Sequence, residues 1–318
     1  MQKLTTDISV ALQALNRDEV IGLPTETVYG LAGNAFKSEV VSKIFAVKNR
    51  PFFDPLIVHI GKLEQLSELS ESIDPKLEKL MSSFWPGPLT VLLPKTDKIP
   101  DLVTSGLPKV AVRMPAHPMA LAVLRALDFP LAAPSANPFG YVSPTQAVHV
   151  QDQLGDQLNV ILDGGDCTVG VESTIVDCRE NKVHVLRLGG ISIEEIELCL
   201  GESVEVELSS SRPAAPGMLD QHYSPMKPLH LIESQKQIPA TVGLYGVISF
   251  GGNLTGPIRY ELSSQGDLIE AASRLFAGLR YMDQQPVQAI YISLLPEQGL
   301  GRAMNDRIRR AVIKSKGI

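Results

Sequence analysis

The stretch FAVKNRPFFDPLIVHI, Phe45–Ile60, joins the end of a helical pattern to the start of a buried strand. The residues just before and within it, SEVVSKIFAVK, repeat apolar side chains at helical spacing. Pro51 biases the preceding residue, Arg50, away from helical angles, so we expect the helix to end near Asn49. The chain should therefore change from helix to extended conformation within this stretch.

Two cations flank this change of conformation, and Asp54 is the acidic residue nearby. Lys48 and Arg50 are two positions apart, which places their side chains about 200° apart on a helix but on one face of an extended segment. The apolar run PLIVHI after them predicts a buried strand that ends in the polar His59. We therefore expect the two cations to converge.

Short apolar runs alternate with helical patterns along the first part of the chain, and this alternation is typical of an α/β fold. The expected strands are EVIGLPT, PLIVHI, LTVLLPK, KVAVRMP, FPLAAPS, NVILDGG, ESTIVDC and KVHVLRLG. The expected helices are SEVVSKIFAVK, DPKLEKLMSSFW and PMALAVLRALD. A first α/β domain is therefore expected over residues 1–201.

The periodic signal fades beyond that point. Residues 202–228 are rich in Ser and Pro and too long for an ordinary connection inside a compact domain, which indicates a linker. Beyond it, LHLIE, TVGLYGVIS and AIYIS are typical of strands, and DLIEAASRLFAGLRYMD and GRAMNDRIRRAVIKS of helices. Residues 229–318 are therefore expected to form a smaller α/β domain.

The overall composition restricts the class of protein. The chain has 318 residues, a formal net charge of −6 and 44% hydrophobic residues, enough for two domains with buried cores. The charge argues against a nucleic-acid binder that is basic over its whole surface, although a local basic cleft would not show in that sum. The three cysteines lack Cys-x-x-Cys spacing, and no apolar run approaches the roughly 18 residues of a membrane span, so a cytoplasmic protein is expected.

Polar residues gather where apolar strands end, the usual place for ligands in α/β sheets. They are Thr25, Thr27 and Tyr29 in LPTETVYGLAG, and Ser135, Asn137 and Ser143 in APSANPFGYVSPT. The first segment can also be interpreted as a capped turn into a helix, and the second as a plain turn. Spacing alone does not separate these interpretations.

Cationic residues also stand at strand margins. Arg113 closes KVAVRMP, where a guanidinium must find an anion or stay solvated; a buried structural ion pair is the alternative. Arg187 and Ser173 have similar positions. With Lys48 and Arg50 these arginines give four candidate cations, a set that suits a polyphosphate. The sequence has no G-x-x-x-x-G-K-[ST] loop and no G-x-G-x-x-G fingerprint, so side chains and strand-end loops would have to hold any nucleotide.

Several blocks, in their order along the chain, resemble the threonylcarbamoyl-AMP synthase family with its YrdC-like domain. The blocks are GLPTETVYGLAG, KNRPFFDPLIVHI, FWPGPLTVLL, VAVRMP, APSANPFGYVSPT, GVESTIVD and LRLGG. APGMLDQHYSP and GLGRAMNDRIRRA resemble the linker and the C-terminal domain of two-domain members. The resemblance implies an α/β fold with a twisted, open, mixed sheet and helices, joined by a long linker to a smaller C-terminal α/β domain.

The resemblance also implies a reaction and its partners. L-threonine, bicarbonate and ATP would give L-threonylcarbamoyl-AMP and pyrophosphate, with Mg²⁺ accompanying ATP. The product would supply threonylcarbamoyl modification of tRNA adenosine 37, so tRNA and the downstream transferase proteins are expected as indirect partners. No membrane partner is implied.

The same resemblance assigns roles to single residues. The signature pairs, expected to be catalytic, are Lys48 with Arg50 and Ser135 with Asn137. Positions that contact ATP are matched by Arg50, Asp54, Lys109, Ser135, Ser143, Arg187 and Tyr223. Positions that bind threonine are matched by Thr27, His59, Arg113, Ala133 and Ser173. Asp54 stands where the family commonly has Asn, and Lys109 where it often has a small hydroxyl residue.

The linker carries a further expectation. Tyr223 lies in the part that resembles the family's active-site cover, so the segment is expected to fold over the catalytic mouth; docking of the second domain is the alternative. Two other functions compete with the synthase. One is an RNA-binding or regulatory module on the same fold, supported by the basic tail RIRRAVIKSK, and the other is carbamoyl-adenylate chemistry.

Overall fold

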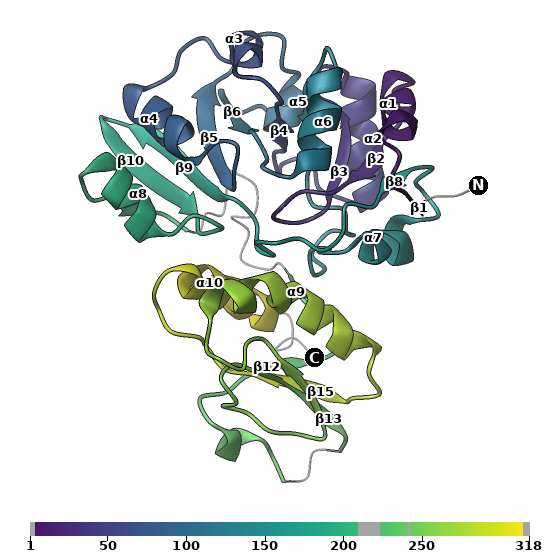
Figure 1. The fold of residues 1–318 in the computed structure, drawn as a ribbon, viewed down its shortest axis with the longest axis vertical. Helices are drawn as coiled ribbons and strands as arrows, with labels where there is room; N and C mark the ends of the chain where they lie inside the picture. Colours follow the sequence, from purple (N-terminus) through teal and green to yellow (C-terminus); the bar gives the residue numbers. More distant parts are fainter. Residues whose placement is uncertain (1–3, 209–222, 241–242, 314–318) are drawn as a thin grey trace.

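The computed structural model describes residues 4–208, 223–240 and 243–313, which form a large and a small α/β unit (Figure 1). The strands of the large unit are β1 (Leu4–Thr5), β2 (Ile21–Leu23), β3 (Gly30–Asn34), β4 (Ile57–His59), β5 (Leu89–Pro94), β6 (Lys109–Arg113), β7 (Leu131–Ala132), β8 (Ile161–Leu162), β9 (Thr174–Arg179), β10 (Lys182–Arg187) and β11 (Glu205–Val206). Its helices are α1 (Ile8–Asn16), α2 (Ser38–Lys48), η1 (Leu63–Gln65), α3 (Leu66–Leu69), α4 (Pro75–Phe84), α5 (Asp101–Thr104), α6 (Pro118–Ala126), α7 (Ala147–Leu154) and α8 (Ile193–Leu200).

The small unit follows the linker. Its elements are β12 (Leu229–Leu231), η2 (Gln235–Gln237), β13 (Tyr245–Ser249), β14 (Ile258–Glu261), α9 (Leu268–Gln284), β15 (Ala289–Ile292) and α10 (Leu300–Ile313). The four strands pair in the order β12-β15-β13-β14, all parallel. The helices α9 and α10 lie between this sheet and the large unit (Figure 1).

The large sheet is mixed, as expected. Its strand order is β1-β8-β2-β3-β7-β4-β6-β5-β9-β10-β11. β4 and β6 are parallel, and so are β5 and β9, whereas β6 pairs antiparallel with β5 and β9 with β10. β11, which lies in the segment expected to be linker, pairs with β10. The predicted α/β fold class is confirmed.

One of the interpretations left open for the segment around Thr27, a capped turn into a helix, is wrong, because the chain continues into strand β3. β3 pairs antiparallel with both β2 and β7. Its sequence, GLAGN, lacks the β-branched residues that indicate a strand. Close packing explains the composition, because a Cβ on Gly33 would lie 2.6 Å from the Val40 side chain of α2.

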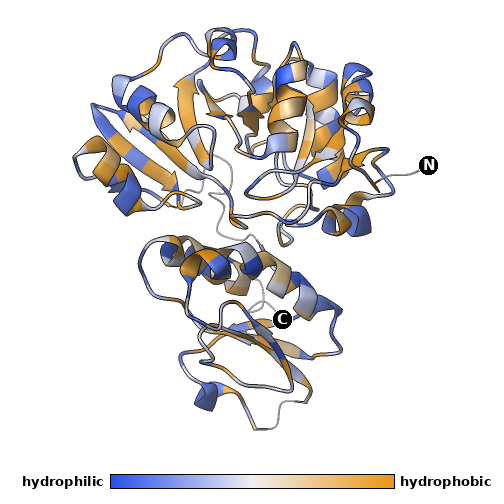
Figure 2. Cartoon of the chain, in the orientation of Figure 1, coloured by the Kyte–Doolittle hydropathy of each residue, from blue (hydrophilic) through white to orange (hydrophobic). Residues whose placement is uncertain are grey.

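Apolar side chains fill the space between sheet and helices, and Figure 2 shows hydrophobic residues concentrated along the strands of the large unit. A second core crosses between the units. It combines Val28, Val142 and Val171 of the large unit with side chains of α9 and α10, among them Phe276 and Ile308. Burial of this shared apolar surface holds the two units in contact.

Within the described residues, no helix is both long and apolar enough to span a membrane.

Candidate active site

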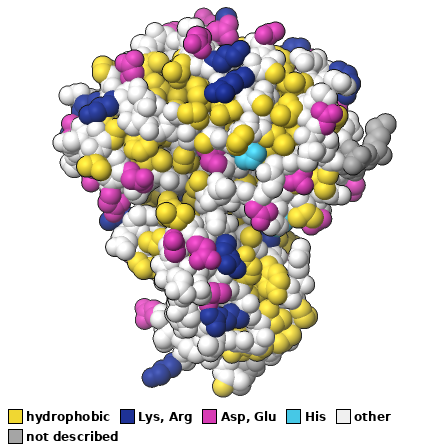
Figure 3. All heavy atoms as spheres, viewed as in Figure 1, with side chains coloured by type: hydrophobic (Ala, Val, Ile, Leu, Met, Phe, Trp, Pro, Cys, Tyr) yellow, Lys and Arg dark blue, Asp and Glu magenta, His cyan; other side chains and the backbone are white. Residues whose placement is uncertain are grey.

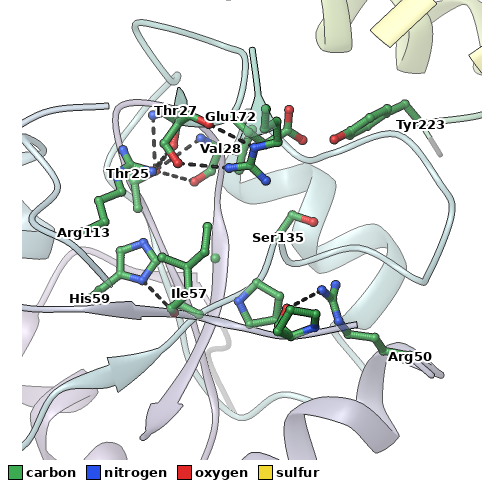
Figure 4. Close-up of a pocket in the computed structure, with 16 residues that line it drawn as sticks. Thr25, Thr27, Val28, Arg50, Ile57, His59, Arg113, Ser135, Glu172 and Tyr223 are labelled. Carbon is green, nitrogen blue, oxygen red and sulfur yellow. Dashed lines mark hydrogen bonds between the residues drawn. The ribbon is translucent and has the colours of Figure 1, made fainter. Parts of the chain in front are cut away.

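One pocket gathers residues that are far apart in the sequence (Figure 4). It is lined by Thr25, Thr27, Val28, Gly30, Arg50, Pro55, Ile57, His59, Arg113, Ala133, Pro134, Ser135, Glu172, Ser173, Arg187 and Tyr223. Strand register explains part of this grouping, because His59 of β4 stands opposite Arg113 of β6. Alternate residues of a strand share a face, so Ile57 and Ala111 lie on that face and form an apolar cluster beside the polar groups.

Of the two cations in the helix-to-strand stretch, Arg50 lines the pocket and Lys48 does not. α2 ends at Lys48, and Asn49 has left-handed backbone angles with φ 50°, as expected from Pro51. Arg50 then turns inward: its Nη2 lies 2.9 Å from Asp54 Oδ2 and donates to the Pro55 carbonyl at 2.8 Å. Burial lowers the pKa of Arg50, and the Asp54 carboxylate acts in the opposite direction.

Lys48 has a different set of contacts. Val40, Ile44 and Lys48 follow one another at helical spacing on the buried face of α2. The Lys48 ammonium donates to the backbone carbonyls of Asn137, at 2.6 Å, and of Ser135. Burial, and then the charge of Arg50, lower its pKa well below the usual range. Lys48 does not line the pocket but holds the Ser-x-Asn loop beside it, and its catalytic role with Arg50 stays a prediction.

Arg113 is both paired and presented to the pocket. Its Nη2 lies 2.6 Å from Glu26 Oε1, and its Nη1 donates to Thr27 Oγ1 at 2.8 Å (Figure 4). Glu26 is 6% exposed and does not line the pocket, so it lies behind the guanidinium. The ion pair considered as an alternative therefore coexists with a place in the site. Our sequence interpretation passed over Glu26, although an acidic residue between two threonines in an apolar segment was a signal.

His59 is held as a neutral hydrogen-bond acceptor. Burial, with a smaller contribution from Arg113, lowers its pKa to about 3. Its Nδ1 lies 3.2 Å from the Ile57 carbonyl, which can only accept, so Nδ1 carries the proton and Nε2 keeps its lone pair. His59 can therefore accept a hydrogen bond from a ligand hydroxyl or amine.

Ser173 and Arg187 meet beside these groups. A register shift in β10 between Val185 and Arg187 re-aims the arginine, whose Nη2 donates to Ser173 Oγ at 3.0 Å. Ser173 Oγ also lies 2.7 Å from Thr90 Oγ1 of β5, the residue opposite Arg113. Burial lowers the pKa of Arg187 to about 10, so the guanidinium stays charged at neutral pH.

Glu172 is a pocket residue that the sequence interpretation missed. Ser143 donates to its Oε1 at 2.7 Å, and Arg307 of α10 lies 2.9 Å from its Oε2. No sequence signal marks this pair, because Arg307 sits in an amphipathic helix 135 residues away. The small unit thus contributes a charged group to the border of the pocket.

Tyr223 joins the same border. It lines the pocket, is 1% exposed, and extends toward Glu172 (Figure 4). Its ring stacks on Phe276 of α9 at 5.5 Å, and the Arg307 guanidinium lies 5.2 Å from the ring centre. Tyr223 therefore touches both the pocket and the small unit. Most of the predicted cover, residues 209–222, lies outside the described residues.

Several residues expected in the site do not line the pocket, and Lys109 lies at the other end of β6 from Arg113, beside a separate hollow. Besides Lys48 they are Asp54, Lys109, Asn137 and Ser143. Asn137 Nδ2 donates to the carbonyls of Pro138 and Tyr141, so it shapes the loop. Lys109 Nζ lies 2.6 Å from Asp177 Oδ1, so in this structure the lysine is held in an ion pair with that carboxylate.

Carboxylates that could hold a metal are scarce at the pocket. Glu172 is the carboxylate among the described lining residues, and both its oxygens are engaged. Elsewhere in the described chain, ligand atoms of His184, Glu205 and Glu207 lie within 4.8 Å of one another. Lys182 and Arg179 already neutralise those two glutamates. Neither arrangement resembles a dedicated metal cage.

The surface view bears on the RNA-binding alternative. On the face shown in Figure 3, acidic and basic side chains are interspersed among apolar and uncharged ones. A backbone-binding surface for nucleic acid would gather basic groups. This face therefore offers the RNA alternative no support.

Comparisons with known proteins cover both units. A family model described as telomere recombination matches residues 13–189, and one described as the C-terminal domain of threonylcarbamoyl-AMP synthase matches residues 191–312. The threonylcarbamoyl-AMP synthases of Pyrococcus abyssi and Bacillus subtilis are each 39% identical over 96% of this chain, which covers 93% and 92% of them. The crystal structure of Pyrococcus abyssi Sua5 complexed with L-threonine matches with a TM-score of 0.91 at 37% identity, over 97% of this chain and 94% of that one.

Proposed function

The chain belongs to the threonylcarbamoyl-AMP synthase family, and we propose from this premise how its pocket divides the reaction among its residues. The chain is a nucleotidyltransferase that uses ATP and L-threonine to form threonylcarbamoyl-AMP. One observation carries the division of roles. A single pocket lining contains all five residues matched to threonine binding and four of those matched to ATP binding, Arg50, Ser135, Arg187 and Tyr223.

We propose that threonine binds beside Arg113, whose guanidinium pairs with the substrate carboxylate. Thr27 already accepts a hydrogen bond from Arg113 and so holds it in place. The lone pair on His59 Nε2 accepts from the threonine hydroxyl or amine. Ser173 supplies a further hydroxyl, and Ala133 limits the size of the ligand that fits.

ATP is proposed to occupy the part of the pocket lined by Arg50, Ser135, Arg187 and Tyr223. Arg50 and Arg187 supply positive charge where the phosphates carry negative charge. Lys48 acts one step back, because its ammonium donates to the backbone carbonyls of Ser135 and Asn137, the two members of the Ser-x-Asn pair. Asp54, Asn137 and Ser143 are likewise proposed to orient residues that contact the ligand. Lys109 is proposed to reach ATP only after its ion pair with Asp177 breaks.

The chemistry needs positioning more than acid–base catalysis. The threonine amine combines with bicarbonate to give a carbamate and water. A carbamate oxygen then attacks the α-phosphorus, and the bond from that phosphorus to the bridging oxygen of pyrophosphate breaks. The neutral His59 is not an acid catalyst at neutral pH, because its one proton is on Nδ1 and faces the Ile57 carbonyl. Fixed cations that face the leaving pyrophosphate lower the barrier electrostatically.

Mg²⁺ is proposed to enter as the counterion of ATP. The pocket offers no free carboxylate among its described lining residues, so phosphate oxygens and water would hold the ion.

Beyond the pocket, tRNA and the downstream transferase proteins are proposed as indirect partners that receive the product. The unpaired cysteines support a cytoplasmic location. The proposed domains are residues 1–201 and 229–318 with a linker over 202–228.

The test is substrate dependence. The full chain is incubated with ATP, Mg²⁺, bicarbonate and threonine, and pyrophosphate and the adenylate are followed by enzymatic assay and mass spectrometry. Release of pyrophosphate should require threonine and bicarbonate together. Equal release with serine, or without bicarbonate, would overturn the threonine assignment.

A further inference from the structure

Arg307 of α10 touches three parts of the pocket border although it lies in the small unit. Its Nε lies 2.9 Å from Glu172 Oε2, and its Nη2 donates to the Leu188 carbonyl at 2.7 Å. Its guanidinium also lies 5.2 Å from the centre of the Tyr223 ring. The Arg307 side chain is fully buried and does not line the pocket. It therefore acts on the pocket only through these neighbours.

Each of the three neighbours either belongs to the proposed nucleotide part of the pocket or directly contacts or adjoins a residue proposed to bind or orient ATP. Glu172 and Tyr223 line the pocket, and Leu188 directly follows Arg187. Glu172 also accepts from the hydroxyl of Ser143, a proposed positioning residue for ATP. One buried arginine thus organises the acid, the cation-bearing strand end and the aromatic ring together.

We propose that Arg307 is a positioning residue that neutralises Glu172, so that the C-terminal unit makes the pocket electrostatically able to accept ATP. This inference rests on the proposed function, because it supposes that ATP enters this pocket.

Electrostatics gives the reason. Glu172 is buried, and its carboxylate stays ionised because Arg307 and then Arg187 favour the charged form; both lower its pKa against the effect of burial. Without Arg307 that negative charge would face the phosphates of ATP, or would draw Arg187 away from them. Both consequences weaken ATP binding in a low-dielectric pocket. Threonine, a zwitterion with no net charge, should be affected much less.

A set of full-length variants tests this. Arg307→Met removes the charge and keeps much of the volume, and Glu172→Gln removes the acid. The double variant removes both, and Tyr141→Phe serves as an interface control, because it deletes only an interdomain hydrogen bond to Asp283. The KM for ATP, the KM for threonine and kcat are measured by pyrophosphate release, with thermal unfolding alongside.

Arg307→Met should raise the KM for ATP by about tenfold, as expected for one unmasked charge near a polyphosphate, and the KM for threonine by less than about twofold. Adding Glu172→Gln should return the KM for ATP to within about threefold of the starting protein. Tyr141→Phe should leave both constants unchanged. An unchanged KM for ATP in Arg307→Met, or no recovery in the double variant, overturns the inference.

Two further outcomes are also decisive. If Arg307→Met does not fold but the double variant folds and uses ATP, the unmasked acid was the defect and the inference stands. If both fail to fold, Arg307 is needed for folding through its other partners, Asp306 at 2.8 Å and the Leu188 carbonyl, and the inference fails. Failure of the proposed function would look different, because the unaltered chain would then show no release dependent on threonine and bicarbonate.

Discussion

Two buried glutamate–arginine pairs border the pocket. They differ in which member of the pair, the arginine or the glutamate, lines it. In the pair within the large unit, Arg113 lines the pocket and Glu26 stands behind it. In the pair between the units, Glu172 lines the pocket and Arg307 stands behind it. All four side chains are less than 10% exposed, so neither pair is screened by solvent.

The difference shows that a buried ion pair does not by itself reveal what a pocket binds. The group in front decides which charge a ligand meets, and the group behind makes burial of that charge tolerable. Arg113 in front suits a carboxylate. Glu172 in front would repel a nucleotide, so its partner has to cancel the charge. Opposite orientations of the same two residue types thus suit the different ligands proposed for the two parts of the pocket.

Arg113→Met gives the largest effect. It removes the ligand-facing group and leaves Glu26 buried without its partner, so the free energy of unfolding should fall by about 3–5 kcal/mol and threonine-dependent pyrophosphate release should be lost. Denaturant unfolding and threonine titration measure the two effects. Adding Glu26→Gln should recover much of the stability but none of the activity, unlike the pair between the units. Recovery of activity would show that Arg113 does not contact threonine.

Lys48→Met tests a buried cation whose partners are backbone carbonyls rather than a glutamate. It leaves the carbonyls of Ser135 and Asn137 without their donor, so stability should fall by about 2–3 kcal/mol and the KM for ATP should rise. Lys43→Met on the exposed side of the same helix is the matched control and should change stability by less than about 0.5 kcal/mol. Equal effects of the two substitutions would show that the buried contacts are energetically unimportant.

The pH dependence of stability tests whether buried His59 stays neutral beside Arg113 in the folded protein. Burial lowers the pKa of His59 to about 3, and that of His149 also to about 3, from about 6.5 when unfolded. The unfolded chain therefore binds more protons between these values, and stability is complete above pH 6.5 and falls as the pH falls toward 3. Between pH 6.5 and 4.5, where carboxylates contribute least, the His59 contribution should be roughly 1–2 kcal/mol.

His59→Asn isolates that contribution. Urea unfolding of both proteins at several pH values in this window should give a shallower pH dependence for the variant. Parallel curves would mean that His59 titrates normally in the folded protein, and that neither burial nor Arg113 keeps it neutral.

Arg302→Ala should have the smallest effect. Arg302 and Glu194 also join α10 to the large unit, at 3.1 Å, but these side chains are 35% and 49% exposed. Solvent screens the pair, so stability should change by less than about 1 kcal/mol and the KM for ATP should not change. A loss as large as that of Arg307→Met would mean that contact between the units, rather than neutralisation of Glu172, supports the pocket.

Features set by neighbouring residues could be predicted from the sequence. Pro51 and the helical repeat located the end of α2 correctly, and apolar runs located β5, β6 and β9. The segment after Thr27 was harder, because β3 is a strand for reasons of packing against α2 rather than of composition. The partners of Lys48 could not be predicted, because the Ser135 and Asn137 carbonyls that its ammonium holds are 87 and 89 residues away in the sequence.

The α/β class, the helix end before Pro51, the candidate cations and the family could all be predicted from the sequence alone. Steric limits and periodicity act over a few residues, and the order of motifs is itself a linear pattern. Only the tertiary structure decided which charge faces the pocket. Glu26 and Arg113 are 87 residues apart, and Glu172 and Arg307 are 135 apart. Strand register and the docking of α10 bring these residues into contact. Contacts between residues so far apart leave no local pattern in the sequence.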